Sequence, residues 1–277
     1  MVTTHRFRRS GVLWYLTGAF TSVLAYRSLY VRLVGRDLHV RYKGSVLGIM
    51  WTLLNPLSLL VVFSFVFGVV LNARWGIGGH NFTLVLFSGL ILFTFLAECI
   101  NRSPSLVLES ASYVKKVVFP LELLPAVTLG TATINLALSL LILACGELWY
   151  GTGLPITWLA VPLVLLPLLV FAYGVVLFLS SLGVFLRDLS QLVGVLTMLL
   201  MYMGPIIFPL DMVPVQFRAW LSLNPLTFPV TQLREVTLNG HWPDWIGLAW
   251  YSIVALLACT GGFWWFWRTK SGFADVV

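Results

Sequence analysis

Six long apolar runs dominate the sequence and leave little room for a water-soluble fold. They lie near residues 46–71, 82–104, 121–149, 157–186, 189–209 and 245–267. Each is long enough to cross a membrane, because a helix needs roughly 20 residues to span the hydrocarbon. Backbone polar groups cannot stay unpaired in lipid, and the runs lack the alternation of barrel strands. The sequence therefore predicts an all-α membrane protein with six transmembrane helices.

Composition agrees with lipid as the main solvent. The chain is 59% hydrophobic and 10% charged, whereas soluble domains carry about 25% charged residues. No stretch outside the apolar runs is long enough to bury a core of its own. We therefore expect one transmembrane domain over residues 1–277. It would comprise a cytoplasmic or interfacial segment (1–44), the six-span bundle (46–267) and a cytoplasmic tail (268–277).

The basic residues predict the orientation of the bundle. The net charge is +7, and 14 of the 17 Lys and Arg residues fall on one side of a six-span topology. Cytoplasmic loops carry such an excess. We expect a multi-pass protein of the cytoplasmic membrane with both termini in the cytoplasm. Because the charges flank membrane spans, they favour contact with anionic lipid rather than with nucleic acid.

Two segments outside the spans have patterns of their own. Arg6, Arg8 and Arg9 precede an apolar stretch over 11–25 and imitate a signal peptide. Export would strand the Arg-rich residues 26–43 on the wrong side, which favours an amphipathic interface helix there. Its apolar face would hold Tyr26, Leu29, Tyr30, Leu33 and Val34, opposite Arg27, Arg32 and Arg36. Between spans five and six, prolines and charges predict a short re-entrant outer hairpin of two helices.

Residue types that support catalysis or metal binding are sparse. Cys99, Cys145 and Cys259 lie in apolar runs without metal-ligand spacing, and the four His show none either. No Ser-His-Asp order stands out, and the ten acidic residues are scattered. We therefore assign no catalytic site and no metal site. The phosphate loop Gly-x-x-x-x-Gly-Lys-Ser/Thr is also missing, so energy must come from a partner subunit or from a gradient. A gradient-driven carrier usually buries charged residues at the membrane midplane, and no charge is convincingly central here. This favours ATP and magnesium on a partner subunit.

The border of the first span is the most distinctive motif. Residues 36–56 run from Arg41, Tyr42 and Lys43 through two glycines and Trp51 to an Asn-Pro pair inside the apolar run. The order resembles the first span of permeases in the polysaccharide branch of type-2 ABC exporters, which export O-antigen, capsule or teichoic-acid chains. The resemblance implies a cytoplasmic entrance for a lipid-linked substrate. Arg41, Tyr42, Lys43 and Trp51 would meet its headgroup, and Gly44 and Gly48 would let helices approach closely.

A second motif lies between spans two and three. Residues 103–125 predict a short amphipathic helix from Ser105 to about Lys116, before a Phe-Pro pair that starts the next span. The segment is similar to the coupling helix of that family, which implies docking on an ABC-type ATPase subunit. Its expected contacts are Ser110, Tyr113, Lys115 and Lys116. A plain cytoplasmic loop is the alternative.

The resemblance also implies the subunit composition of the whole transporter. Two copies of the chain would form the conduit above two ATPase subunits, since six helices cannot easily enclose a sugar chain. Spans one and five would line it through Phe63, Tyr202 and Phe208, although aromatic residues also pack in cores or face lipid. The outer hairpin would act as a gate through Asp211, Arg218, Asn224 and Arg234.

The sequence leaves rival functions open. Export of teichoic acid or a capsular polymer fits the same pattern as export of O-antigen. Export of a drug or small lipid shares the fold, but relatives of that kind often carry a larger outer domain. A membrane glycosyltransferase would need clustered carboxylates, which this chain lacks, and a purely structural role leaves the basic entrance segment unexplained.

Overall fold

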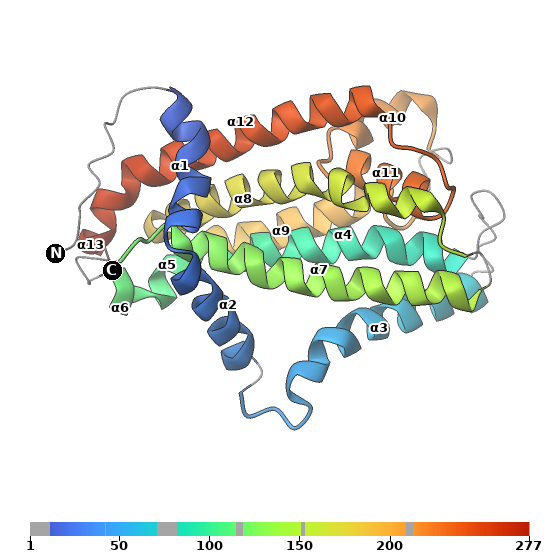
Figure 1. The fold of residues 1–277 in the computed structure, drawn as a ribbon, viewed down its shortest axis with the longest axis horizontal. Helices are drawn as coiled ribbons and strands as arrows, with labels where there is room; N and C mark the ends of the chain where they lie inside the picture. The colour runs from blue at the N-terminus through green and yellow to red at the C-terminus, as the bar shows by residue number, and fades with distance from the viewer. Residues whose placement is uncertain are drawn as a thin grey trace.

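The computed structural model describes residues 12–41, 43–70, 82–114, 119–150, 153–208 and 213–276. Within these ranges the chain is helical and contains no strand. Long helices run side by side along the longest axis of the molecule (Figure 1). The short helices α5, α6 and α13 lie at one end of this bundle, and α10 and α11 lie at the other.

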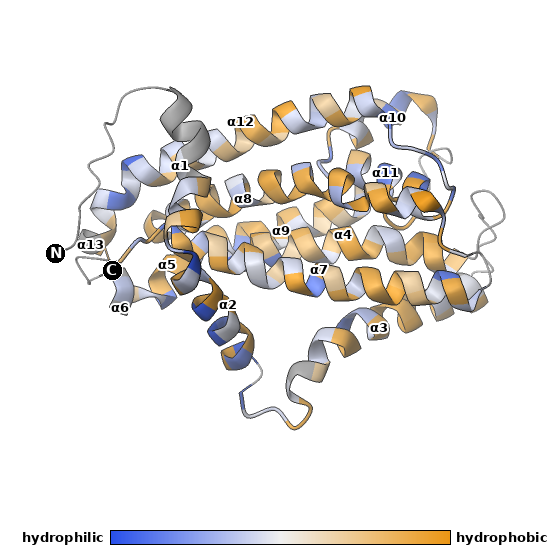
Figure 2. Ribbon diagram, in the orientation of Figure 1, coloured by the Kyte–Doolittle hydropathy of each residue, from blue (hydrophilic) through white to orange (hydrophobic). Residues whose placement is uncertain are grey.

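Five helices are long and apolar enough to cross a membrane. They are α3 (Trp51–Phe63) with its π-helical continuation Ser64–Val70, α4 (Phe82–Arg102), α7 (Leu123–Trp149), α8 (Val161–Phe185) led by the 3-10 turn Ile156–Ala160, and α12 (Trp245–Thr269). Apolar residues cover these helices along their length, while polar residues gather at α2 and at the two ends of the bundle (Figure 2). A protein with several membrane spans is therefore confirmed.

The fifth predicted span is shorter than expected. Helix α9 (Leu189–Tyr202) has 14 residues, which at 1.5 Å per residue is about 21 Å and less than the hydrocarbon thickness. Gly204 and Pro205 follow the helix end, and proline is poorly accommodated by a continuing helix. Residues 204–207 are nevertheless buried. The structure thus shows five full-length candidate spans and one short apolar helix, not six equal spans.

Helices α8 and α12 form the closest helix pair through two glycines. A Cβ atom on Gly262 would lie 2.1 Å from the backbone oxygen of Gly174, and one on Gly174 would lie 2.5 Å from the backbone of Ala258. Small residues let membrane helices approach until their backbones touch. The main apolar core lies beside this pair, where α4 packs against α7, α8 and α11 (Thr227–Thr237).

The N-terminal helices cross the bundle at a steep angle to its long axis (Figure 1). Helix α1 (Val12–Ala25) meets α12, and α2 (Arg27–Arg41) packs on α7. Leu33 and Val34 are buried on α7, whereas Arg27, Arg32 and Arg36 are exposed. A helix is therefore present here with Leu33 and Val34 buried, while Tyr26 lies before it and is exposed. Its position at the membrane interface stays a prediction.

The predicted coupling segment is not one helix. It forms two four-residue helices, α5 (Leu106–Glu109) and α6 (Ala111–Val114), separated at Ser110. The backbone of Ser110 leaves the helical region with φ −100° and ψ 24°. Lys115 and Lys116 lie outside the described residues. The segment is seated on α8, because a Cβ atom on Gly183 would lie 2.1 Å from the oxygen of Pro104.

Two short helices connect α9 to α12, and whether they form a re-entrant outer hairpin stays a prediction. They are α10 (Val215–Ser222) and α11. After α12 the chain forms the 3-10 turn Lys270–Gly272 and α13 (Phe273–Val276). Lys270 makes a 2.7 Å ion pair with Glu122, just before α7. This pair holds the last described residues of the chain near the start of α7, where α5 also lies.

Candidate functional site

A cluster of charged side chains lies where α2 meets α4 and α7. Arg102, in the last turn of α4, donates from Nη1 to Asp37 Oδ2 at 3.0 Å and from Nη2 to Asp37 Oδ1 at 2.8 Å. Two parallel bonds of this kind are the strongest arrangement for an arginine and a carboxylate. Both side chains are about three-quarters shielded from solvent. The pair therefore fixes α2 to the end of α4.

A second ion pair extends the cluster toward the interior of the bundle. Arg41 Nη2 lies 2.6 Å from Glu98 Oε1. Asn135 of α7 donates to the other oxygen of Glu98 at 2.8 Å, and Thr131 donates to Asp37 Oδ2 at 2.9 Å. Two guanidinium groups thus face two carboxylates, and two neutral side chains from α7 complete the network.

Electrostatics keeps the outer carboxylate ionised. Burial alone raises the pKa of Asp37, but the hydrogen bonds and positive charge of Arg102, with Thr131 and Arg41, hold that pKa below its usual range. Opposite charges and donors stabilise the charged form of a carboxylate. Asp37 therefore carries its negative charge at neutral pH.

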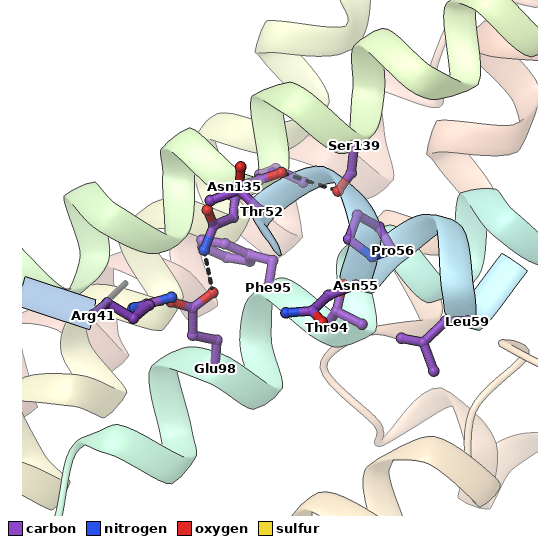
Figure 3. Close-up of a pocket in the computed structure, with 11 residues that line it drawn as sticks. Arg41, Thr52, Asn55, Pro56, Leu59, Thr94, Phe95, Glu98, Asn135 and Ser139 are labelled. Carbon is purple, nitrogen blue, oxygen red and sulfur yellow. Dashed lines mark hydrogen bonds and ion pairs between the residues drawn. The ribbon is translucent and has the colours of Figure 1, made fainter. Parts of the chain in front are cut away.

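A cavity of about 200 Å³ opens beside the cluster, between α3, α4 and α7. Figure 3 shows the chain of contacts from Arg41 through Glu98 to Asn135 at one end, with Pro56 and Leu59 at the other. Among the described residues, the buried Oδ1 of Asn135 has no hydrogen-bond partner. The lining residues are Arg41, Thr52, Asn55, Pro56, Leu59, Thr94, Phe95, Glu98, Asn135, Leu136 and Ser139.

Most of this cluster was missed by sequence reasoning, although a signal was present. Its members recur four residues apart on each helix, as Asp37 with Arg41, Glu98 with Arg102, and Thr131 with Asn135. Residues four apart share one face of a helix. Three pairs of polar residues with this spacing, each near the same border of the membrane, therefore indicate a polar cluster where the helices meet.

The expected headgroup residues have different surroundings. Arg41 is held by Glu98, whereas Lys43 is exposed and Tyr42 lies outside the described residues. Trp51 is 39% exposed and donates from Nε1 to Ser45 Oγ at 2.9 Å. The structure thus brings Arg41 to the cavity, and Lys43 lies in the turn that follows α2.

Gly44 and Gly48 have a role that differs from the expected one. Their φ angles are +85° and +51°, and a Cβ atom on either would meet nothing within 4 Å in the described chain. Glycine adopts positive φ without the steric cost that other residues incur. Within one copy of the chain they shape the turn between α2 and α3 rather than a close helix contact.

The expected ATPase contacts are partly described. Tyr113 of α6 accepts a hydrogen bond from Arg36 of α2, whose guanidinium carbon lies 5.3 Å from the centre of the tyrosine ring. Ser110 is half-buried between α5 and α6. Helices α6 and α2 are therefore in direct contact at this point.

The expected channel residues do not share one environment. Phe63 and Phe208 pack against the main apolar core. Tyr202, at the end of α9, is 58% exposed. Only Tyr202 presents its ring to the surroundings in a single copy of the chain.

Two of the expected gate residues, Asn224 and Arg234, are buried where α10 and α11 meet the rest of the bundle. Arg234 is 4% exposed and donates to the backbone oxygens of Val85 at 3.2 Å and Ile206 at 3.1 Å. Asn224 donates to Leu200 O at 2.9 Å. Both side chains thus cap carbonyls around the break after α9. Arg218 donates to Val213 O, and Asp211 lies outside the described residues.

Metal binding is not supported in the part of the chain that the structure describes, where no three His, Cys, Asp or Glu side chains converge. All three cysteines are free, and Cys99 and Cys259 are buried. The polar cluster is thus composed of ion pairs and amides, without a metal-ligand set.

Comparison with known proteins identifies the family. The description "ABC-2 type transporter" matches residues 28–238, which is most of the chain. The chain belongs to the ABC-2 type transporter family. The family match runs from α2 to α11 and includes the charged cluster, the cavity and the outer hairpin.

Individual relatives of this ABC-2 transporter are named as polysaccharide permeases. An O-antigen export system permease protein RfbA of Myxococcus xanthus is 31% identical over 245 residues, which cover 86% of this chain and 92% of that protein. One from Klebsiella pneumoniae is 30% identical over 76% of this chain and 81% of its own. The polysialic acid transport protein KpsM of Escherichia coli is 24% identical over 80% and 86%.

Proposed function

We propose that this ABC-2 transporter is the membrane subunit of an ATP-driven exporter that moves a lipid-linked polysaccharide of the O-antigen type across the cytoplasmic membrane. The observation that carries the proposal is the 31% identity that extends over 92% of an O-antigen export permease. The chain itself is a non-catalytic permease, and ATP and magnesium are bound by a separate ATPase subunit.

The working assembly is a homodimer with two ATPase subunits. Its support is the large apolar surface that remains on the outer faces of α3 and α9, where Val61, Phe65, Leu192, Val195 and Met198 are each about half exposed or more. Lipid and a second copy of the chain can both cover such a surface. In this arrangement α9 and the buried residues 204–207 that follow it complete a sixth crossing, and both termini lie in the cytoplasm.

The charged cluster receives the phosphate groups of the carrier lipid. Arg41 already pairs with one carboxylate at 2.6 Å, and a phosphate oxygen presents the same charge-assisted acceptor to a guanidinium. Phosphate therefore competes with Glu98 for Arg41, while the exposed Lys43 supplies a second cation. Displacement of Glu98 would loosen the end of α2 from α4.

Coupling to ATP follows the contacts of α2. Motion of the coupling segment reaches Arg36 through Tyr113, passes along α2 to Asp37 and Arg41, and ends beside Thr52 and Asn55 of α3. Helix α3 faces the conduit in the proposed dimer. The contact between α6 and α2 and the cavity shared by Arg41 and α3 support such a path from the ATPase to the conduit.

Substitutions at the cluster test the headgroup role. Arg41→Gln removes the cation and also the close partner of Glu98, which keeps only Arg102 at 3.9 Å and the bond from Asn135. It is therefore compared with Arg41→Gln/Glu98→Gln, which removes both charges of the pair. Lys43→Gln is a third variant without a described ion-pair partner. We expect surface polysaccharide to fall about tenfold or more in all three, while the complex with the ATPase stays intact. Full export by the double variant would show that Arg41 acts only as the partner of Glu98.

A capsular polymer is the second candidate substrate, because the relative KpsM is named for polysialic acid transport. Teichoic acid, and less so a drug or small lipid, remain further alternatives. Expression in two deletion strains, one lacking its O-antigen permease and one lacking its capsule permease, separates these substrates. Restoration of O-antigen alone supports the first candidate, and restoration of capsule alone supports the second.

A further inference from the structure

We propose that the cavity between α3, α4 and α7 holds one sugar ring of the exported chain, next to the phosphate at Arg41. This inference rests on the proposed function and extends it from the headgroup to the glycan. The cavity lies between helices of a single copy, so each protomer would carry its own ring site.

The wall of the cavity has the chemistry that a sugar requires. Amides of Asn55 and Asn135 and hydroxyls of Thr52 and Ser139 line it, and Phe95 supplies an aromatic surface. Sugar hydroxyls both donate and accept hydrogen bonds, as amides and hydroxyls do. Flat rings pack against the apolar faces of sugars, so the mixture of groups suits a polyhydroxylated ring better than an acyl chain.

One polar atom of the wall lacks a partner. The Oδ1 atom of Asn135 is buried and accepts no hydrogen bond from the described residues, although Nδ2 of the same amide donates to Glu98. A buried acceptor without a donor is unfavourable, because it has lost its hydrogen bonds to water without a replacement. A ligand hydroxyl in the cavity would remove this cost, which gives the site a reason to prefer a donor-rich molecule.

Size limits the occupant to a single ring. A volume of about 200 Å³ is below the roughly 300–1,000 Å³ of pockets for drug-sized ligands. It corresponds to the space of about six or seven water molecules. A disaccharide would have to extend out of the cavity, so the ring beside the phosphate is the part that fits.

The position of the cavity agrees with a ring attached to a phosphate. Arg41 and Glu98 belong both to the charged cluster and to the cavity wall. Glu98 lies four residues before Arg102, one turn from the end of α4. A phosphate at Arg41 would therefore place the first sugar against Asn135 and Ser139 without crossing an apolar barrier.

Photo-crosslinking tests the site directly. A small diazirine amino acid replaces Ser139, whose hydroxyl bonds only to the backbone of its own helix at Asn135 O. The matched control carries the same amino acid at Leu141, which is 62% exposed two residues further along α7. A third variant carries a diazirine lysine at Lys43. Inside-out vesicles from cells that make the lipid-linked glycan are illuminated with the ATPase complex arrested without ATP.

Mass spectrometry of the α7 peptide then decides between the outcomes. We expect a sugar-containing adduct at position 139 at least tenfold above that at position 141. Adducts at Lys43 without any at 139 would overturn the ring site and leave the proposed function intact. Absence of adducts at all three positions, together with no loss of surface polysaccharide on deletion of the gene, would overturn both.

Discussion

At the scale of single residues, the structure turns scattered charges into one cluster. Asp37 and Arg41 come from α2 and pair with Arg102 and Glu98 of α4, more than fifty positions away in the sequence. Their charges balance, and each carboxylate also accepts a bond from α7. Charges held this way are stable near the membrane border only as a set, because removing one partner leaves another charge shielded from water and unpaired.

Arg102→Gln should therefore destabilise the protein more than a change to both members of the pair. Loss of the two charge-assisted bonds to Asp37 is expected to cost about 1–3 kcal/mol. Asp37→Asn/Arg102→Gln should recover part of that loss, because neither charge then remains alone. The thermal midpoint of the purified protein in detergent measures the effect. The single variant Asp37→Asn completes the comparison. If the losses of Asp37→Asn and Arg102→Gln add up to the loss of the double variant, the pair is not coupled.

Arg234 offers a second test at this scale. It bonds to two backbone carbonyls with different nitrogens, and lysine cannot reproduce that fork. Arg234→Lys should lower the thermal midpoint and reduce export, even though the positive charge is retained. The exposed Arg268 on α12, changed to Lys, is the control and should leave both unchanged.

At the scale of elements, the apolar runs of the sequence predicted α3, α4, α7, α8 and α12 within a few residues of their bounds. Long periodic segments are predictable because lipid permits few alternatives to a helix. The early end of α9 could be inferred from Gly204 and Pro205, but the contacts from Asn224 and Arg234 to residues 200–206 depend on the fold and could not. The division of the coupling segment at Ser110 also depends on its seat against α8.

Adjacent glycines in α12 provide a matched pair for the helix packing. A Cβ on Gly262 would lie 2.1 Å from the backbone oxygen of Gly174, whereas one on Gly261 would meet nothing within 4 Å. Gly262→Ala should separate α8 from α12 at a cost of about 1–3 kcal/mol or more. Gly261→Ala should be neutral or slightly stabilising, because alanine favours helix. Thermal unfolding of the two variants compares them, and similar midpoints would contradict the close approach.

At the scale of the whole molecule, one described copy forms a bundle with a polar cavity but leaves α3, α9 and α12 with wide apolar faces. The charged cluster escaped prediction because its parts are ordinary border charges when considered one at a time. Only the fold shows that α2 brings Asp37 and Arg41 to the end of α4 and to Thr131 and Asn135 on the side of α7. The family resemblance was carried by residues 36–56 and 103–125, and the family match confirms it.

The assembly should contain two copies of this chain and two copies of an ABC-type ATPase. Native mass spectrometry of the complex purified in detergent gives the stoichiometry. A complex that holds a single permease copy would contradict the proposed homodimer.

Transport in proteoliposomes tests the central claim most directly. The permease is reconstituted with its ATPase partner and a lipid-linked glycan, and a membrane-impermeant glycosidase reports glycan that has reached the far side. We predict that the glycan becomes accessible only with both subunits and hydrolysable ATP. Arrival of glycan without ATP, or with the permease alone, would contradict an ATP-driven exporter.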